Sequence, residues 1–122
     1  MGDGSKVAAW MAASRPRTLV ASLSPVCIGA SLALREVDEI SWTLVSLCLA
    51  FAMFMQVGAN FANDYYDFVK GADDERRLGP ARSVASGVVS PSVMRMTAFG
   101  TLAFGFALGL FLMEFSGAGW PL

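Results

Sequence analysis

The amide and acidic side chains between residues 56 and 73 have the types and spacing that could hold a metal ion. Placed on a helix at about 100° per residue, six polar residues lie within an arc of about 120°; they are Gln56, Asn60, Asn63, Asp64, Asp67 and Lys70. Outside that arc lie the neighbouring aromatic residues, Phe61, Tyr65, Tyr66 and Phe68. The sequence therefore predicts a helix with one polar face and one aromatic face.

Asp64 and Asp67 are three residues apart on the polar face, so their negative charges repel each other unless a cation is bound. Mg²⁺ prefers oxygen ligands and is often held by one or two carboxylates together with substrate phosphates. Asn60 can orient these carboxylates or supply a carbonyl oxygen. Gly71 is expected to end or bend the helix, which would let Asp73 fold back toward the same cation. We therefore predict that Asp64, Asp67 and Asp73 bind Mg²⁺ through a substrate phosphate.

The alternative is that these charges form an ordinary solvated loop after a membrane helix. Against this, the polar face begins inside an apolar stretch, at Gln56 and Asn60, and polar residues at membrane depth are usually functional. We therefore favour the metal site.

The composition excludes several other kinds of chemistry. The 122 residues contain no histidine, which excludes a Ser-His-Asp triad, a His-ligated zinc and a His general base. Two cysteines cannot form an all-cysteine zinc site or a disulfide scaffold. A net charge of −1 gives no indication of nucleic-acid binding. The chain is 55% hydrophobic and 16% charged, whereas soluble domains are about 45–50% apolar and about 25% charged, so we expect a membrane protein.

The chain contains three long stretches without a charged residue, at 18–34, 40–63 and 96–113. Each approaches the roughly 20 residues that a membrane helix needs. We therefore predict an all-α, polytopic transmembrane helix bundle with spans at about 17–35, 41–63 and 93–114 and a motif loop at 64–92. Gly105 and Gly109 form a small-xxx-small pattern, which is typical of closely packed membrane helices.

Basic residues indicate the orientation of the spans. Lys6, Arg15 and Arg17 precede the first span, and the loop at 35–39 is acidic. Five more basic residues lie between or beside the second and third spans: Lys70, Arg76, Arg77, Arg82 and Arg95. Because Lys and Arg concentrate in cytoplasmic loops, the N-terminus and the loop at 64–92 are expected in the cytoplasm.

Arginines and serines follow the acidic residues. The guanidinium group binds diphosphate oxygens well through its planar set of donors. The same residues could equally serve only to anchor the loop on the cytoplasmic side. The candidate diphosphate ligands are Lys70, Arg76, Arg77, Arg82 and Ser86.

Three blocks of sequence together resemble the UbiA-type membrane prenyltransferases, and within them the 1,4-dihydroxy-2-naphthoate polyprenyltransferases. The first is similar to that family's first helix and runs from Trp10 through Ser14-Arg15-Pro16-Arg17-Thr18-Leu19 to Gly29. The second resembles the first aspartate-rich motif and reads Asn60-x-x-Asn63-Asp64-Tyr65-x-Asp67-x-x-x-Gly71-x-Asp73. The third resembles the loop after that motif and reads Gly79-Pro80-x-Arg82-x-x-x-Ser86-Gly87-x-x-Ser90-Pro91.

The resemblance implies a bundle of about nine membrane helices, of which residues 1–122 form the first third as a single N-terminal membrane segment. It implies that Mg²⁺ joins two aspartate-rich motifs to an allylic polyprenyl diphosphate, and that the prenyl cation then attacks an aromatic ring. On this reading the enzyme is a Mg²⁺-dependent polyprenyltransferase of menaquinone synthesis in a bacterial-type inner membrane. The catalytic residues would be Asn60, Asp64 and Asp67.

Two alternatives remain open at this point. The acceptor could be another aromatic compound, such as 4-hydroxybenzoate or a chlorophyllide, or the chain could be a non-enzymatic three-span membrane protein. After Glu75 the only acidic residue is Glu114, so a second aspartate-rich motif is absent from these residues. We therefore expect the 122 residues to be an incomplete enzyme that is inactive by itself.

Overall fold

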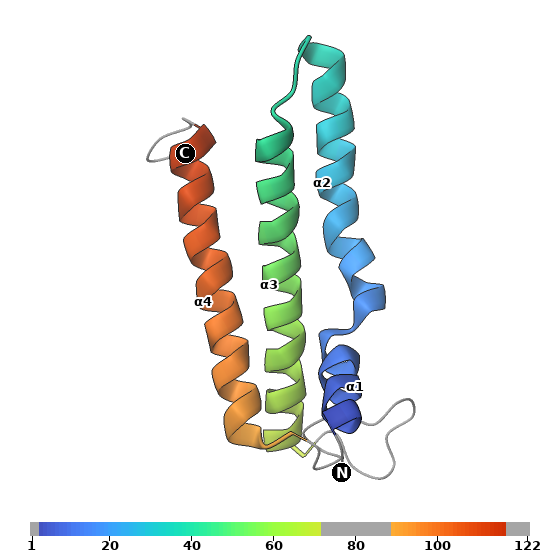
Figure 1. The fold of residues 1–122 in the computed structure, drawn as a ribbon, viewed down its shortest axis with the longest axis vertical. Helices are drawn as coiled ribbons and strands as arrows, with labels where there is room; N and C mark the ends of the chain where they lie inside the picture. Colours follow the sequence, from blue (N-terminus) through green and yellow to red (C-terminus); the bar gives the residue numbers. More distant parts are fainter. Residues whose placement is uncertain (1–2, 72–88, 117–122) are drawn as a thin grey trace.

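The computed structural model describes residues 3–71 and 89–116 and forms four helices in that part of the chain. They are α1 (Asp3–Ser14), α2 (Pro16–Glu36), α3 (Trp42–Val69) and α4 (Pro91–Ser116). α3 stands between α2 and α4, and α1 lies beside the C-terminal part of α3 (Figure 1). No strand occurs within the described residues. The prediction of an all-α fold is confirmed.

Three stretches of helix are long and apolar enough to cross a membrane: Lys6–Glu36, Trp42–Val69 and Pro91–Ser116. α3 has 28 residues, which corresponds to about 42 Å and exceeds a hydrocarbon core of about 30 Å. The predicted three spans are therefore confirmed, and the chain is an integral membrane protein.

The motif loop expected at 64–92 begins later than that range, because α3 continues as an amphipathic helix to Val69. Gly71 then adopts a φ of 74°, a conformation that glycine reaches without steric cost, and this ends the helix as predicted. α4 in turn begins at Pro91. Residues 72–88 lie outside the described part of the chain.

Helix ends follow local signals in the sequence. Ser41 accepts a hydrogen bond from the backbone N–H of Leu44 at 3.1 Å and caps α3. Ser90 caps α4 in the same way, by accepting from the N–H of Val93 at 3.2 Å. Between α1 and α2, Pro16 has no N–H and disfavours a helical conformation in the residue before it. Arg15 leaves the right-handed helical region and adopts a left-handed conformation, with φ 50° and ψ 71°, and the two helices separate there.

Glycines bring α3 and α4 into close contact. A Cβ atom on Gly58 would lie 2.8 Å from two side-chain carbons of Leu102 and 3.2 Å from its backbone N. On the opposite helix, a Cβ on Gly105 would lie 2.9 Å from Met55 Sδ, and one on Gly109 would lie 2.9 Å from a ring carbon of Phe51. The small-xxx-small pattern on α4 therefore does face its neighbour, and Gly58 supplies a matching surface on α3.

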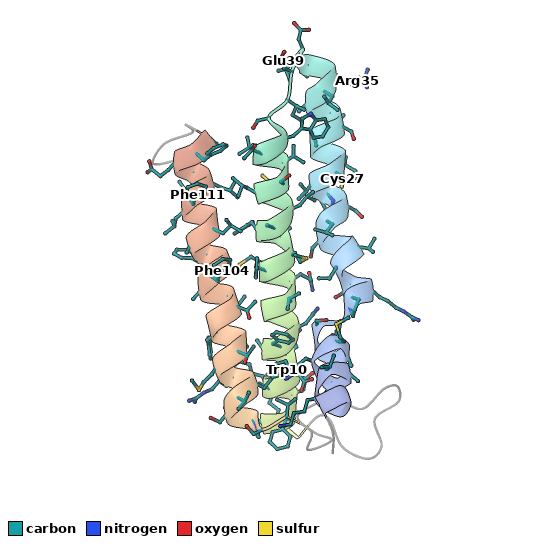
Figure 2. The ribbon with its side chains drawn as sticks, in the orientation of Figure 1. Trp10, Cys27, Arg35, Glu39, Phe104 and Phe111 are labelled. Carbon is teal, nitrogen blue, oxygen red and sulfur yellow. The ribbon has the colours of Figure 1, made fainter. Side chains whose placement is uncertain are left out.

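The best-buried apolar side chains gather at one end of the bundle, where α1, α3 and α4 come together. Met94 is fully buried there, and Phe61 packs edge-to-face against Trp10 with ring centroids 5.3 Å apart. Large apolar side chains elsewhere on α2 and α4 point outward, including Phe104 and Phe111 (Figure 2). Such apolar faces are suited to contact with lipid or with further membrane helices.

We expect Gly58→Ala to destabilise the contact between α3 and α4. The added methyl group would overlap the side chain of Leu102, and overpacking of this kind costs about 1–3 kcal/mol. Unfolding followed by circular dichroism in detergent micelles should show the loss. Gly100→Ala is the matched control, because no atom lies within 4 Å of a Cβ at Gly100. Equal stability of the two variants would contradict this account of the interface.

Candidate active site

The polar face of α3 is turned toward α1 and α2. Asn60 is only 2% exposed, and its Nδ2 donates two hydrogen bonds. One goes to the backbone carbonyl oxygen of Ser14 at 2.8 Å, and the other goes to Thr18 Oγ1 at 2.9 Å. These two acceptors lie on opposite sides of the break at Arg15. The Asn60 amide therefore joins the end of α1 to the start of α2.

Gln56 extends this polar contact one turn further into the membrane. Its Nε2 donates to Asn60 Oδ1 at 3.2 Å, and its Oε1 accepts a short hydrogen bond from Ser22 Oγ on α2. The membrane-embedded part of the predicted stripe, Gln56 and Asn60, is therefore a hydrogen-bonded chain between helices rather than a solvated surface. Both oxygen and nitrogen atoms of the Asn60 amide are used in it.

The aspartates continue the same face toward the C-terminal end of α3. Asp64, one turn after Asn60, is 1% exposed, and Asp67 in the next turn is half-buried. Asn63 and Lys70 are exposed. A charged carboxylate at such a depth is stable only when cations or hydrogen-bond donors compensate its lost hydration. The two carboxylates therefore form a polar site that runs from the buried interior to the end of the helix.

Of the metal ligands that the sequence predicted, Asp64 and Asp67 lie in the described part of the chain. Residues 3–71 and 89–116 contain no group of three His, Cys, Asp or Glu side chains that could hold a metal by themselves. Several predicted ligands lie outside these ranges, namely Asp73, Arg76, Arg77, Arg82 and Ser86. What the structure brings together is thus a pair of carboxylates, to which further ligands must be added.

Arg15 is a functional candidate that the sequence suggested mainly as a membrane anchor. Its side-chain nitrogen Nη2 is buried and has no hydrogen-bond partner within the described residues. Its left-handed backbone costs about 1–2 kcal/mol for a residue with a Cβ. Strained backbone and unsatisfied buried donors both concentrate at functional sites, and a guanidinium donor is suited to anionic oxygens. The signal in the sequence was an arginine directly before the proline that separates two helices.

The tyrosines of α3 lie away from this site. Tyr65 and Tyr66 contact each other with ring centroids 5.0 Å apart, and both line a cavity on the side of α4. The face of α3 that carries the carboxylates is therefore separate from the face that carries the tyrosines.

We expect Asn60→Ala to destabilise the junction of α1 and α2. The substitution leaves the Ser14 carbonyl without its amide donor in a buried position, at a cost of about 1–3 kcal/mol. Asn63→Ala provides the control, because Asn63 has the same side chain on the same helix but is exposed. Trypsin should cleave after Arg17 faster in Asn60→Ala than in the control. Identical cleavage rates would show that the amide does not hold the junction.

Comparison with known proteins places the chain in a family. The model of the UbiA prenyltransferase family matches residues 22–118. A 1,4-dihydroxy-2-naphthoate octaprenyltransferase of Mycobacterium tuberculosis is 38% identical over 105 residues, which are 86% of this chain and 35% of the relative. A protein of the same name from Haemophilus influenzae is 32% identical over 109 residues, which are 88% of this chain and 35% of the relative.

A more distant relative is the UbiA prenyltransferase domain-containing protein 1 of Danio rerio, which is 36% identical over 72 residues; these are 59% of this chain and 21% of the relative. No solved structure matches the chain significantly. The chain spans about a third of the length of the first two relatives. With a family match over most of its length and the polar stripe in a membrane helix, this chain belongs to the UbiA prenyltransferase family.

Proposed function

We propose that this chain takes part in the transfer of a polyprenyl group from an allylic polyprenyl diphosphate to 1,4-dihydroxy-2-naphthoate, a step of menaquinone synthesis. The observation that carries the proposal is the buried Asp64 beside the half-buried Asp67 on one face of a membrane helix. Relatives that match most of the chain bear the name of this activity. A non-enzymatic three-span protein has no evident need for a buried carboxylate beside a second one.

We infer that the cofactor is Mg²⁺. Carboxylate oxygens of Asp64 and Asp67 would bind it together with oxygens of the substrate diphosphate, and Asp73 would add a ligand from the segment after Gly71. Bound there, Mg²⁺ would stabilise the charge on the departing diphosphate. Two observations support an anionic ligand at this place: the depth of the Asp64 carboxylate and the unused donor of Arg15.

The residues of this chain would divide the work between them. Arg15 donates an N–H to a phosphate oxygen, and Lys70, Arg76, Arg77, Arg82 and Ser86 add further donors at the open end of the site. Asn60 acts by holding the junction of α1 and α2, and with it the backbone on both sides of Arg15. The apolar helices exclude water, which would otherwise capture the prenyl cation.

A second aspartate-rich motif is required for this mechanism, and we infer that residues outside this sequence supply it. The proposed site opens on the cytoplasmic side of a bacterial-type inner membrane, together with the N-terminus. The distribution of Lys and Arg supports this orientation.

A chimera tests whether the chain supplies part of such an enzyme. The 122 residues would replace the matching third of the Mycobacterium tuberculosis relative and be expressed in a strain that lacks its own naphthoate prenyltransferase. We expect the chimera to restore menaquinone, as measured by quinone extraction and mass spectrometry. The 122 residues alone should give no prenylated naphthoate. A chimera that reaches the membrane, shows native helicity and makes a different prenylated quinone would redirect the proposal to another aromatic acceptor.

Removing either carboxylate from the chimera tests the metal site. We expect Asp64→Asn and Asp67→Asn each to lower product formation by about a hundredfold or more, because each removes a ligand charge. Asp67→Asn should also raise the Mg²⁺ concentration that gives half-maximal activity. Asp38→Asn, in the exposed loop between α2 and α3, makes the same change of side chain at the other end of the protein and should have no effect. Full activity of Asp64→Asn in the presence of EDTA would rule out the proposed site.

A further inference from the structure

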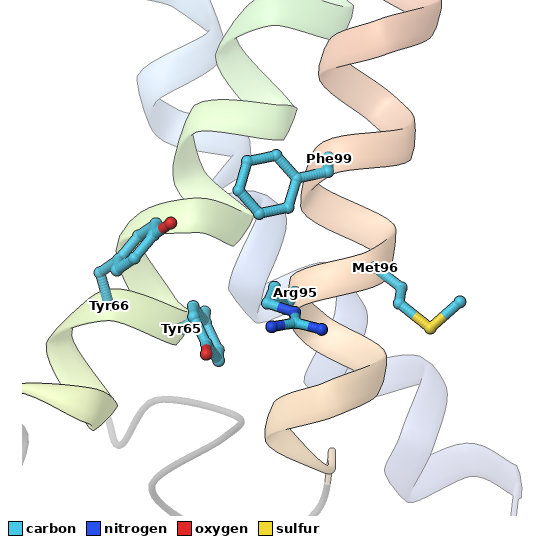
Figure 3. Close-up of a pocket in the computed structure, with 5 residues that line it drawn as sticks. All are labelled: Tyr65, Tyr66, Arg95, Met96 and Phe99. Atoms are coloured by element: carbon cyan, nitrogen blue, oxygen red, sulfur yellow. The ribbon is translucent and has the colours of Figure 1, made fainter.

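A cavity of about 590 Å³ opens between α3 and α4 on the side away from the carboxylates. Five residues line it: Tyr65, Tyr66, Arg95, Met96 and Phe99. Figure 3 shows the guanidinium of Arg95 next to the ring of Tyr65, with Phe99 deeper along α4 and Met96 on the outer side. We name this the tyrosine–arginine groove. It contains both tyrosines of the chain.

The groove lies at the level where α4 leaves the polar region. Arg95 is the first charged residue of α4, and the next 18 residues, from Met96 to Met113, carry no charge. Arg95, Met96, Phe99 and Tyr66 are all exposed. Tyrosine and arginine are typical of membrane–water interfaces, whereas Met96 and Phe99 are suited to the acyl-chain region. The groove therefore has a cationic group at its polar end and apolar side chains next to it. This order matches the anionic headgroup and the acyl chains of a phospholipid.

Among the described residues that line the groove, Arg95 carries the one charge and none is acidic. In the same described part of the chain, no ion pair or hydrogen bond to the Arg95 side chain is recorded. The guanidinium group is therefore available to an anionic ligand, and two phenol hydroxyl groups nearby can donate further hydrogen bonds. Its volume falls within the range of sites that hold molecules of drug size, so it can take a headgroup and the start of an acyl chain.

We propose that the tyrosine–arginine groove binds an anionic phospholipid, with the phosphodiester on Arg95 and the first part of an acyl chain against Phe99 and Met96. The groove is distinct from the proposed catalytic site, because the contacts of Asn60 and Gln56 place the polar face of α3 against α1 and α2. The proposal therefore does not depend on prenyl transfer.

Lipid titration of the full chain tests the proposal. Delipidated protein in detergent would be mixed with dioleoyl-phosphatidylglycerol or with dioleoyl-phosphatidylcholine, and bound lipid would be counted by native mass spectrometry. The wild type should prefer the anionic lipid by about fivefold, the effect of one favourable basic residue near a membrane surface. Arg95→Gln should abolish that preference, and Tyr66→Phe should reduce it in part.

Arg35→Gln is the matched control, because it removes the same charge from an exposed position at the opposite end of the bundle (Figure 2). It should keep the preference of the wild type. Circular dichroism of Arg95→Gln should show unchanged helicity, since the side chain is exposed and its loss leaves no buried group unpaired.

Two results would overturn the proposal. In the first, Arg95→Gln would keep the preference, or Arg35→Gln would lose it equally, which would show that overall charge rather than the groove selects the lipid. In the second, farnesyl diphosphate would displace phosphatidylglycerol from the wild type and fail to bind Arg95→Gln, which would assign the groove to the prenyl substrate.

Discussion

The arrangement of the helices depends on one buried amide. The break between α1 and α2 interrupts backbone hydrogen bonding, and a lipid bilayer offers no water to replace the missing bonds. Asn60 replaces part of them, because its amide donates to the Ser14 carbonyl before the break and to Thr18 Oγ1 after it. Arg15 adopts its left-handed conformation at this break, next to the Ser14 carbonyl that Asn60 contacts. A polar residue in α3 thus permits a non-helical position elsewhere in the chain.

α3 performs two different packing tasks on opposite faces. On the face toward α4, Gly58 lets the Leu102 side chain approach the α3 backbone closely, and the contact depends on shape alone. On the other face, Gln56 and Asn60 make hydrogen bonds to α2 and to the junction before it. Close packing and hydrogen bonding are two main sources of attraction between helices in lipid. Lipid tails are as apolar as the side chains, so apolar residues gain no hydrophobic free energy by moving from lipid into a helix contact. The structure uses one on each side of the same helix.

Much of this architecture could be predicted from the sequence. Uncharged stretches indicated the three spans, and the 3.6-residue period placed Gln56, Asn60, Asp64 and Asp67 on one face. Helical periodicity shows which residues share a face of a helix, but it does not show which other helix that face contacts. Asn60 and Ser14 are 46 positions apart, so their hydrogen bond depends on how α1 turns back along α3. The unsatisfied nitrogen of Arg15 and the groove between Tyr65 and Arg95 likewise depend on packing, although the Arg15-Pro16 pair marks the break at which Arg15 lies. The predicted roles of Asp73, Arg76, Arg77, Arg82 and Ser86 stay predictions, since these residues lie outside the described part of the chain.

The two unlike faces of α3 also fix its rotation and its height in the bundle. A turn of one residue, about 100° about its axis, would remove Gly58 from Leu102 and carry Asn60 away from the junction of α1 and α2. A slide of one helical turn, about 5.4 Å, would separate Gln56 from Ser22. The two contacts therefore restrain both the rotation and the height of α3. A ligand site on a helix restrained in this way would lose little conformational freedom on binding, and the restraint would come from residues outside that site.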